Sequence, residues 1–160
     1  MTREERNPNT KWFTYNNVNP KNKINGDCVI RAIANAMNKS WDEVNEELFR
    51  YSVKYKTILN DKHTYEKYLK DNNWIKCKQP RKDNNKRYTG REFIDYLTKL
   101  NDNSNKIILI GCHHMSCIIY KNKQVKIEDI WDCSDGCVGN YWEYNGRLLK
   151  WNQIYLKQLY

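Results

Sequence analysis

A cysteine at the start of an apolar helix is the first feature of this sequence that suggests chemistry. Residues 24–39 read INGDCVIRAIANAMNK, in which Gly26 and Asp27 form a turn signal. The residues that follow recur at helical spacing, namely Val29, Ile30, Ile33 and Met37. Cys28 therefore begins the predicted helix, where unpaired N–H groups and the helix dipole favour a thiolate. Small residues are also common at helix starts, so position alone does not establish a nucleophile.

A nucleophilic cysteine needs a base, and the chain has three histidines. His63 lies in a polar helical segment and is expected on the surface. His113 and His114 follow the apolar run of residues 106–111 and begin the next predicted strand. The alternation of residues along that strand does not decide between these two histidines.

Asp129 is the candidate third member, because it lies on the strand after the Lys-Asn-Lys turn at residues 121–123. A carboxylate there could bond the far ring nitrogen of the histidine and stabilise the imidazolium. The alternative interpretation is a solvated charge at the end of a strand. The spacing leaves both interpretations open.

The same region holds an alternative set of metal ligands. Four of the six cysteines lie close to the two adjacent histidines, and the whole set is Cys112, His113, His114, Cys117, Cys133 and Cys137. These spacings are close to those of structural zinc sites. However, Cys117 lies inside an apolar strand and Cys112 ends one, which is ordinary for core cysteines. We therefore predict no metal and no other cofactor; zinc would also compete with the triad for His114.

The elements that position these residues are predicted to be helices first and a sheet afterwards. Helices are expected over residues 28–38, after a capping box at Ser40, over 63–72, and after a second capping box at Thr89. Strands are expected over residues 74–78 and 106–111, on both sides of the 121–123 turn, and in a hairpin about Asn145 and Gly146. This order is typical of an α+β fold with an antiparallel sheet.

A length of 160 residues is typical of one domain with its own core. Residues 1–23 show no sustained period and are predicted to be an extended lead-in, attached to the body by its aromatic residues. The core is expected over residues 24–143. Residues 144–160 are expected to extend it as a strand or a short helix.

The composition favours a folded chain with a basic surface. Only 39% of residues are hydrophobic and the mean hydropathy is -0.98, but 13% are aromatic, which is too many for a disordered chain. No run reaches the roughly 20 apolar residues of a membrane span, and the charged N-terminus is unlike a signal peptide. We therefore expect a cytoplasmic chain without a membrane partner, whose six cysteines form no disulfide scaffold.

The net charge of +9 makes a nucleic acid or an acidic protein a candidate partner. The densest basic stretch, residues 78–91, is nevertheless typical of a solvated surface loop. Residues 141–160 combine aromatic and basic side chains, which can stack on bases and bind phosphates. A non-catalytic binding protein is therefore the alternative to an enzyme, although nucleic acid is not the favoured partner.

In chain order these parts resemble the papain-like cysteine peptidases, and most closely their compact C39-like group. GDCVIRAIANAMNKSWDEV is similar to the nucleophile helix of that group, and HHMSCIIYKNKQVKIEDIWDCSD to its histidine strand, turn and acid strand. The resemblance covers roughly residues 20–143, and these two blocks carry its specificity. It implies a papain-like fold in which N-terminal helices, the nucleophile helix among them, pack on a C-terminal antiparallel sheet.

The resemblance also implies a role for each residue of the triad. Cys28 would be the nucleophile, His114 the base and Asp129 the acid that orients the base. His114 is chosen over His113 because small or apolar strand residues follow it, as they do in the family.

Around the triad, the resemblance implies that Trp131 shields the bond between base and acid from water. The family also uses a glutamine shortly before the cysteine as an oxyanion donor. No glutamine stands there in this chain, so Asn22 or Asn25 would have to serve. Many members have a glycine directly after the cysteine, where this chain has Val29.

The implied activity is acyl transfer through a thioester, as in a cysteine peptidase or isopeptidase acting on a protein or peptide. The same triad supports deamidation and transglutaminase-like transfer, and the sequence does not choose among them. The resemblance further implies a phage-encoded protein acting on a host protein in the host cytoplasm. Nothing in the sequence indicates an oligomeric state.

Overall fold

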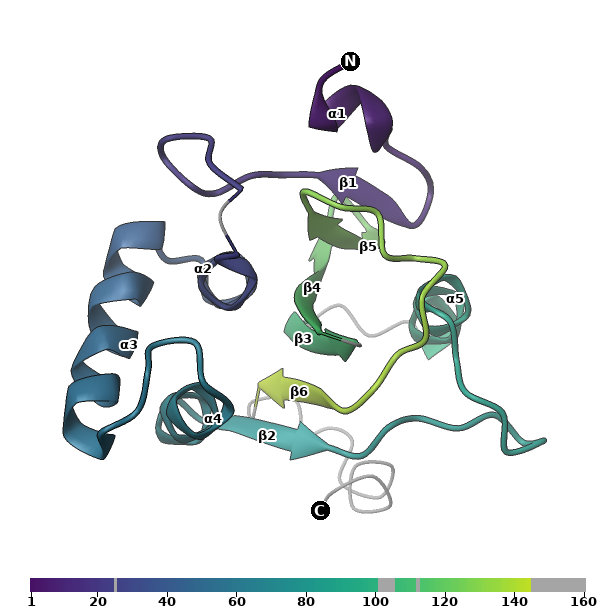
Figure 1. Cartoon of the computed structure of the whole chain (residues 1–160). Helices are drawn as coiled ribbons and strands as arrows, with labels where there is room; N and C mark the ends of the chain where they lie inside the picture. The colour runs from purple at the N-terminus through teal and green to yellow at the C-terminus, as the bar shows by residue number, and fades with distance from the viewer. Residues whose placement is uncertain (25, 101–105, 112, 145–160) are drawn as a thin grey trace.

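A six-stranded sheet runs through the part of the chain that the structure describes, with helices on both of its faces (Figure 1). The structure is a computed structural model, and it describes residues 1–24, 26–100, 106–111 and 113–144. In sheet order the strands are β1 (Phe13–Tyr15), β5 (Gln124–Asp129), β4 (His114–Lys121), β3 (Lys106–Gly111), β6 (Tyr141–Tyr144) and β2 (Trp74–Cys77). The predicted α+β class is confirmed.

Helices flank the sheet in two groups. Within the described residues they are α1 (Arg3–Arg6), α2 (Cys28–Met37), α3 (Trp41–Tyr55), α4 (Lys62–Asp71) and α5 (Gly90–Leu100). Helix α2 packs against β3 and β4, and on the same side α3 packs on α2 while α4 packs on α3 and on the edge strand β2 (Figure 1). Helix α5 covers the opposite side and contacts β5. The helix that carries the candidate nucleophile therefore lies directly on the central strands.

The two capping boxes read from the sequence are present as contacts. Ser40 accepts a hydrogen bond from the backbone N–H of Glu43, whose side chain accepts one from the N–H of Ser40. Thr89 and Glu92 make the same reciprocal pair before α5. These contacts satisfy N–H groups that a helix start leaves unpaired, and so they fix where α3 and α5 begin.

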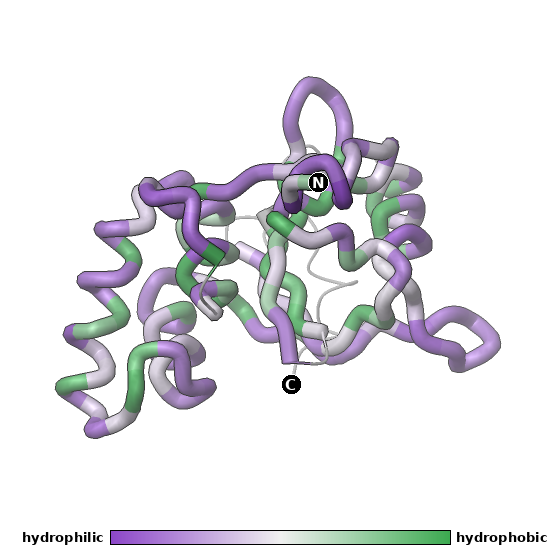
Figure 2. Tube along the Cα trace, turned by 45° about the horizontal axis from the view of Figure 1, so that its top comes forward, coloured by the Kyte–Doolittle hydropathy of each residue, from purple (hydrophilic) through white to green (hydrophobic). Residues whose placement is uncertain are grey.

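Alternate residues of β4 face the two sides of the sheet and divide the core in two. Met115 and Cys117 pack in one cluster with residues of α2, whereas Ile118 belongs to a second cluster with Phe93 and Leu97 of α5. In Figure 2 the central strands and α2 are mostly hydrophobic. The loop at residues 78–89 is hydrophilic and extends from the body, as expected for a solvated basic loop.

The predicted sheet is wrong in two details. It is not wholly antiparallel, because β1 pairs in parallel with β5, with Phe13 opposite Ile127. It is also not wholly C-terminal, because β1 precedes all but one of the helices and β2 pairs with β6 at the other edge. A strand of three residues is too short to show a period, so the sequence gives no sign of β1.

The predicted lead-in and tail have different outcomes. The lead-in is not simply extended, because it contains the short helix α1 as well as β1. Its attachment through aromatic residues is correct for Phe13, which is fully buried. The strand β6 accounts for the first part of the predicted C-terminal hairpin. The turn about Asn145 and Gly146 and the rest of the tail lie outside the described residues.

Candidate active site

Cys28 is the first residue of α2, and its side chain is half-buried and free of any disulfide. Asp27 precedes it as the N-cap residue but makes no side-chain cap bond. Burial alone raises the pKa of the Cys28 thiol, but hydrogen bonds from His114 and from the backbone N–H of Met115 outweigh it. The pKa of Cys28 consequently lies below its ordinary value, which favours the reactive thiolate.

His114 begins β4 and contacts both other members of the predicted triad. Its Nε2 lies 2.6 Å from Oδ2 of Asp129, and the ring also hydrogen-bonds Cys28. Because Nε2 is hydrogen-bonded to Asp129, Nδ1 is the ring nitrogen that is available to the thiol. Burial alone lowers the pKa of His114, but the bonds to Asp129 and Cys28 raise it to about 9. The ring is therefore an imidazolium at neutral pH.

The structure also distinguishes the alternatives that the sequence left open. His113 is exposed in the turn before β4, with a φ of 57°, and His114 is the histidine that reaches the site. Asp129 is only 5% exposed, so it is not a solvated charge. Its Oδ1 accepts a hydrogen bond from the N–H of Ile130 at 2.7 Å, which leaves Oδ2 for the imidazole.

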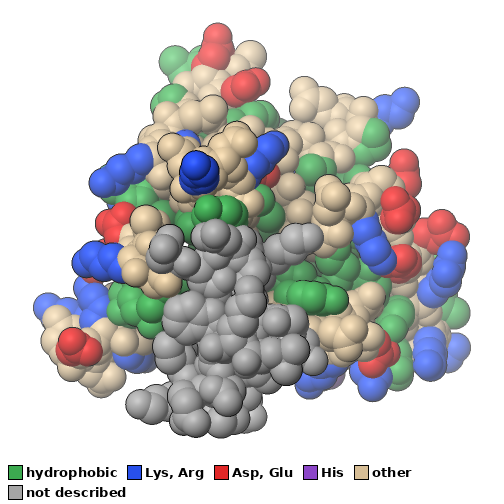
Figure 3. Space-filling view, turned by 180° about the vertical axis from the view of Figure 1, so that it is seen from behind, with side chains coloured by type: hydrophobic (Ala, Val, Ile, Leu, Met, Phe, Trp, Pro, Cys, Tyr) green, Lys and Arg blue, Asp and Glu red, His purple; other side chains and the backbone are tan. Residues whose placement is uncertain are grey.

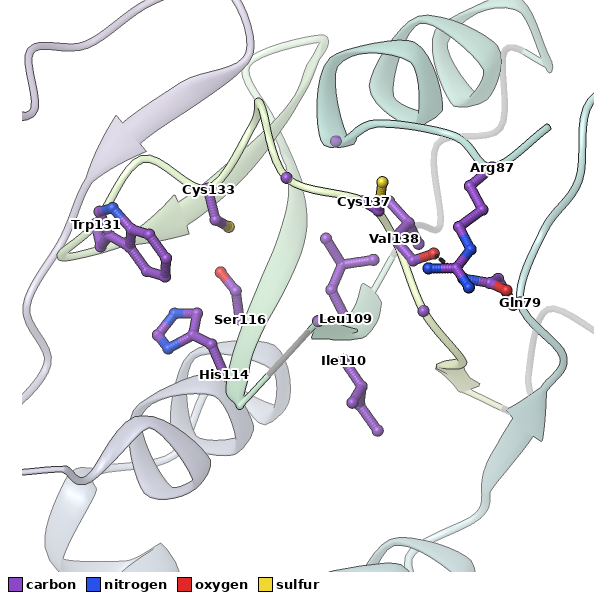
Figure 4. A pocket seen from close by; sticks show the side chains of 14 residues that line it. Gln79, Arg87, Leu109, Ile110, His114, Ser116, Trp131, Cys133, Cys137 and Val138 are labelled. Atoms are coloured by element: carbon purple, nitrogen blue, oxygen red, sulfur yellow. Dashed lines mark hydrogen bonds between the residues drawn. The ribbon is translucent and has the colours of Figure 1, made fainter.

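Trp131 lies beside the imidazole of His114 (Figure 4). The two ring centroids are 5.1 Å apart and the ring planes meet at 71°, which is an edge-to-face contact. The Trp131 side chain is itself 48% exposed. It therefore stands between part of the imidazole and the solvent, a position compatible with the shielding role that the resemblance implies.

A buried charge network that the sequence analysis missed joins the start of α2 to the triad acid. Arg31, one turn into α2, forms a salt bridge with Asp27, and its Nη2 lies 4.0 Å from Oδ1 of Asp129. Asp27 also accepts hydrogen bonds from Nδ2 of Asn19 at 3.0 Å and from Nε1 of Trp41 at 2.8 Å. The guanidinium thus offsets the cost of burying two carboxylates. The available signal was the spacing of four residues between Asp27 and Arg31.

The predicted oxyanion donors are not brought to the thiol by any described contact. Asn22 is exposed in a turn, and its side-chain oxygen accepts a hydrogen bond from Nδ2 of Asn17 at 3.1 Å. Asn25 lies outside the described residues. Asp27 makes no side-chain cap bond to the N–H groups at the start of α2, the helix end at which Cys28 lies. N–H groups in such a position can serve as oxyanion donors.

The alternative metal ligands lie in different surroundings. Cys117 is fully buried on the α2 side of β4, while Cys133 is half-buried and Cys137 is exposed. Burial raises the pKa of Cys133 to about 12, which disfavours the thiolate that a metal requires. Among the described residues, which do not include Cys112, no three or more His, Cys, Asp or Glu side chains are grouped to hold a metal ion.

Removal of the thiol is expected to reveal the proton linkage of His114 in stability measurements. In a Cys28→Ala variant the imidazole keeps Asp129, so its pKa stays above the unfolded value of about 6.5. Just above that pH the folded state holds more protons than the unfolded state. The free energy of unfolding therefore falls as pH rises from about 6.5 through the folded pKa. Urea denaturation across this range measures the slope.

The wild-type protein is the control, and its free energy of unfolding should change less with pH. The lowered pKa of Cys28 stabilises the folded state above the unfolded thiol pKa of about 8.5, and this contribution is lost as pH falls. The contribution of Cys28 to the free energy of unfolding therefore rises with pH, whereas that of His114 falls. Where Cys28 is a thiolate in the folded state and a thiol in the unfolded state, the proton it lacks offsets the extra proton on His114, so the free energy of unfolding changes less with pH than in Cys28→Ala. Identical slopes in the two proteins would contradict an ion pair.

Comparisons with protein-family models, with curated proteins and with solved structures find no match to this chain. Within the described ranges, no helix combines the length and the apolar character needed to cross a lipid bilayer. Any function must therefore be argued from the geometry of the site.

Proposed function

We propose that this chain is a thiol-dependent acyl-transfer enzyme with a papain-like arrangement, and most closely a cysteine peptidase or isopeptidase. The observation that carries this proposal is the position of His114 between the thiol of Cys28 and the buried carboxylate of Asp129. A nucleophile, a base bonded to it and an acid that orients the base are the parts that covalent catalysis requires. The packing of α2 on the central strands supports the papain-like assignment.

The first chemical step starts from the thiolate and the imidazolium. The Cys28 sulfur attacks the carbonyl carbon of the substrate, and the negative charge that develops on the oxygen is stabilised by the N–H groups at the start of α2. The carbon–nitrogen bond then breaks. His114 gives its proton to the leaving amine, so that a thioester on Cys28 and a neutral imidazole remain.

The second step restores the enzyme. His114 takes a proton from water while the water oxygen attacks the thioester carbon, the carbon–sulfur bond breaks, and a carboxylic acid leaves. Cys28 is again a thiolate beside an imidazolium. In deamidation the leaving group of the first step would be ammonia, and in transglutaminase-like transfer a second amine would replace water. All three reactions share the thioester, which is the intermediate that the proposal requires.

The alternative of a basic binding surface has less support. On the face shown in Figure 3, the Lys and Arg side chains are scattered and interspersed with Asp and Glu rather than gathered in one stripe. Scattered charge gives weak phosphate recognition compared with a continuous groove. Most of the aromatic and basic tail lies outside the described residues. Cytoplasmic location and a phage setting stay predictions that follow from the sequence.

An activated ester tests the thioester without knowledge of the natural substrate. Incubation with p-nitrophenyl acetate is expected to release a burst of about one p-nitrophenolate per protein and to leave an acetyl group on Cys28. Peptide mapping by mass spectrometry identifies the modified cysteine, with exposed Cys137 as the internal reference thiol. A Cys28→Ala variant should give no burst. Acetylation of Cys137 in preference to Cys28 would overturn the proposal.

A further inference from the structure

His114, the candidate base, is one of the residues that line a cavity of about 390 Å³. Figure 4 shows His114 and Trp131 at one end of it and Arg87 and Gln79 at the other. Its volume lies within the roughly 300–1,000 Å³ of sites that hold small ligands. Cys28 is not among its lining residues. The cavity therefore adjoins the site without containing the sulfur.

The position of the cavity indicates which part of a substrate it would receive. In the proposed reaction the imidazolium of His114 gives its proton to the leaving amine, so the leaving group has to lie next to this ring. His114 lines one end of the cavity, and Cys28 does not line it. It is thus on the leaving-group side of the bond that breaks, and the acyl part of the substrate stays on the side of Cys28.

The middle of the cavity is apolar. Leu109 and Ile110 of β3 line it together with Val138 from the segment before β6 (Figure 4). Four of the other lining residues are glycines, which add no side chain to fill the space. These surfaces favour an aliphatic or aromatic group over a charged one.

The far end of the cavity is suited to an anion. Arg87 is exposed there, and none of the described residues forms an ion pair with it. Neighbouring Gln79 is held by a hydrogen bond from its Nε2 to the carbonyl oxygen of Val138 at 2.8 Å. No Asp or Glu lines the cavity. A guanidinium without a competing acid binds a carboxylate through paired N–H donors.

We propose that this cavity binds the leaving end of a peptide substrate, as a short apolar segment that ends in a free carboxylate at Arg87. This proposal rests on the proposed function and specifies its substrate class. An apolar side chain of this substrate segment would pack between Leu109 and Val138. The enzyme would then release residues from the C-terminal end of a peptide, and a blocked C-terminus would lower the rate.

Binding of two small probes tests this proposal apart from catalysis. N-acetyl-leucine and N-acetyl-leucinamide differ only in the terminal carboxylate, and NMR titration of the Cys28→Ala protein gives the affinity of each. Because Arg87 is exposed, we expect the carboxylate to bind about fivefold more tightly, with a preference that shrinks as salt is added. The preference should disappear in Cys28→Ala/Arg87→Ala.

Arg81 provides the matched control, because it lies in the same loop, is exposed and does not line the cavity. The fivefold preference should persist in Cys28→Ala/Arg81→Ala. Equal affinity for the two probes, no binding of either, or a preference that survives loss of Arg87 would overturn the proposal. None of these outcomes affects the acetylation of Cys28, so a failure of the cavity proposal is distinct from a failure of the enzyme proposal.

Discussion

Replacement of His114 by alanine is expected to slow the alkylation of Cys28 by iodoacetamide at least about tenfold at pH 7. The thiolate is the reacting form, and an ordinary thiol of pKa about 8.5 is only a few per cent thiolate at this pH. Without His114, burial would raise the pKa of Cys28, and the N–H of Met115 and the start of α2 would be left to favour the thiolate. Mass spectrometry of the Cys28 peptide against time gives the rate.

His63→Ala is the matched control for this experiment. His63 also faces a carboxylate, with its Nδ1 3.0 Å from Oδ1 of Asp61, but on the exposed surface at the start of α4. Its loss should leave the alkylation rate of Cys28 unchanged. If Cys28 is alkylated as fast in the His114→Ala variant as in the wild type, the imidazole does not stabilise the thiolate. That result would contradict the proposed triad.

Replacement of Arg31 by methionine should lower the free energy of unfolding by about 3 kcal/mol. Methionine is apolar and about as long as arginine, so it fills the same space. It leaves Asp27 and Asp129 without their buried cation. Loss of one partner from a buried salt bridge costs about 3–5 kcal/mol. The lower end applies here, because both carboxylates keep hydrogen-bond donors, Trp41 on Asp27 and the N–H of Ile130 on Asp129.

Arg50→Met is the control, because Arg50 also pairs with an acid four residues away, Glu46, but on the exposed face of α3. An exposed pair of this spacing is worth about 0.3–0.5 kcal/mol. Urea denaturation at pH 7 compares the two variants. If the free energy of unfolding falls by the same small amount in both variants, the charge network around Arg31 does not stabilise the protein. A reduced rate of Cys28 alkylation in Arg31→Met, measured where the variant is folded, would show that it also positions Asp129.

The residues of the candidate site were predictable because their signals are local. The turn and apolar period around Cys28 and the hairpin between β4 and β5 are visible within short windows. Capping boxes likewise located two helix starts. The periodicity did not decide between His113 and His114; the family resemblance selected His114, and in the structure His113 has a positive φ and is exposed in the turn.

The parts that escaped prediction depend on contacts between distant segments. Arg31 interrupts the apolar residues of α2, and its importance appears only when Asp129 is brought against it. The parallel pairing of β1 with β5 joins segments more than a hundred residues apart and leaves no periodic pattern. The cavity at Arg87 likewise needs a loop, two strands and the segment before β6 to meet.

The rate of alkylation of each described cysteine against pH, in the wild-type protein, tests the central claim most directly. The account predicts that Cys28 reacts with a midpoint below the ordinary thiol value of about 8.5. Cys117, which is fully buried, should stay unmodified in the folded protein, and half-buried Cys133, whose pKa is raised to about 12, should react more slowly than Cys28. A midpoint for Cys28 at or above the ordinary value, or reaction no faster than at Cys117 and Cys133, would contradict a catalytic thiolate.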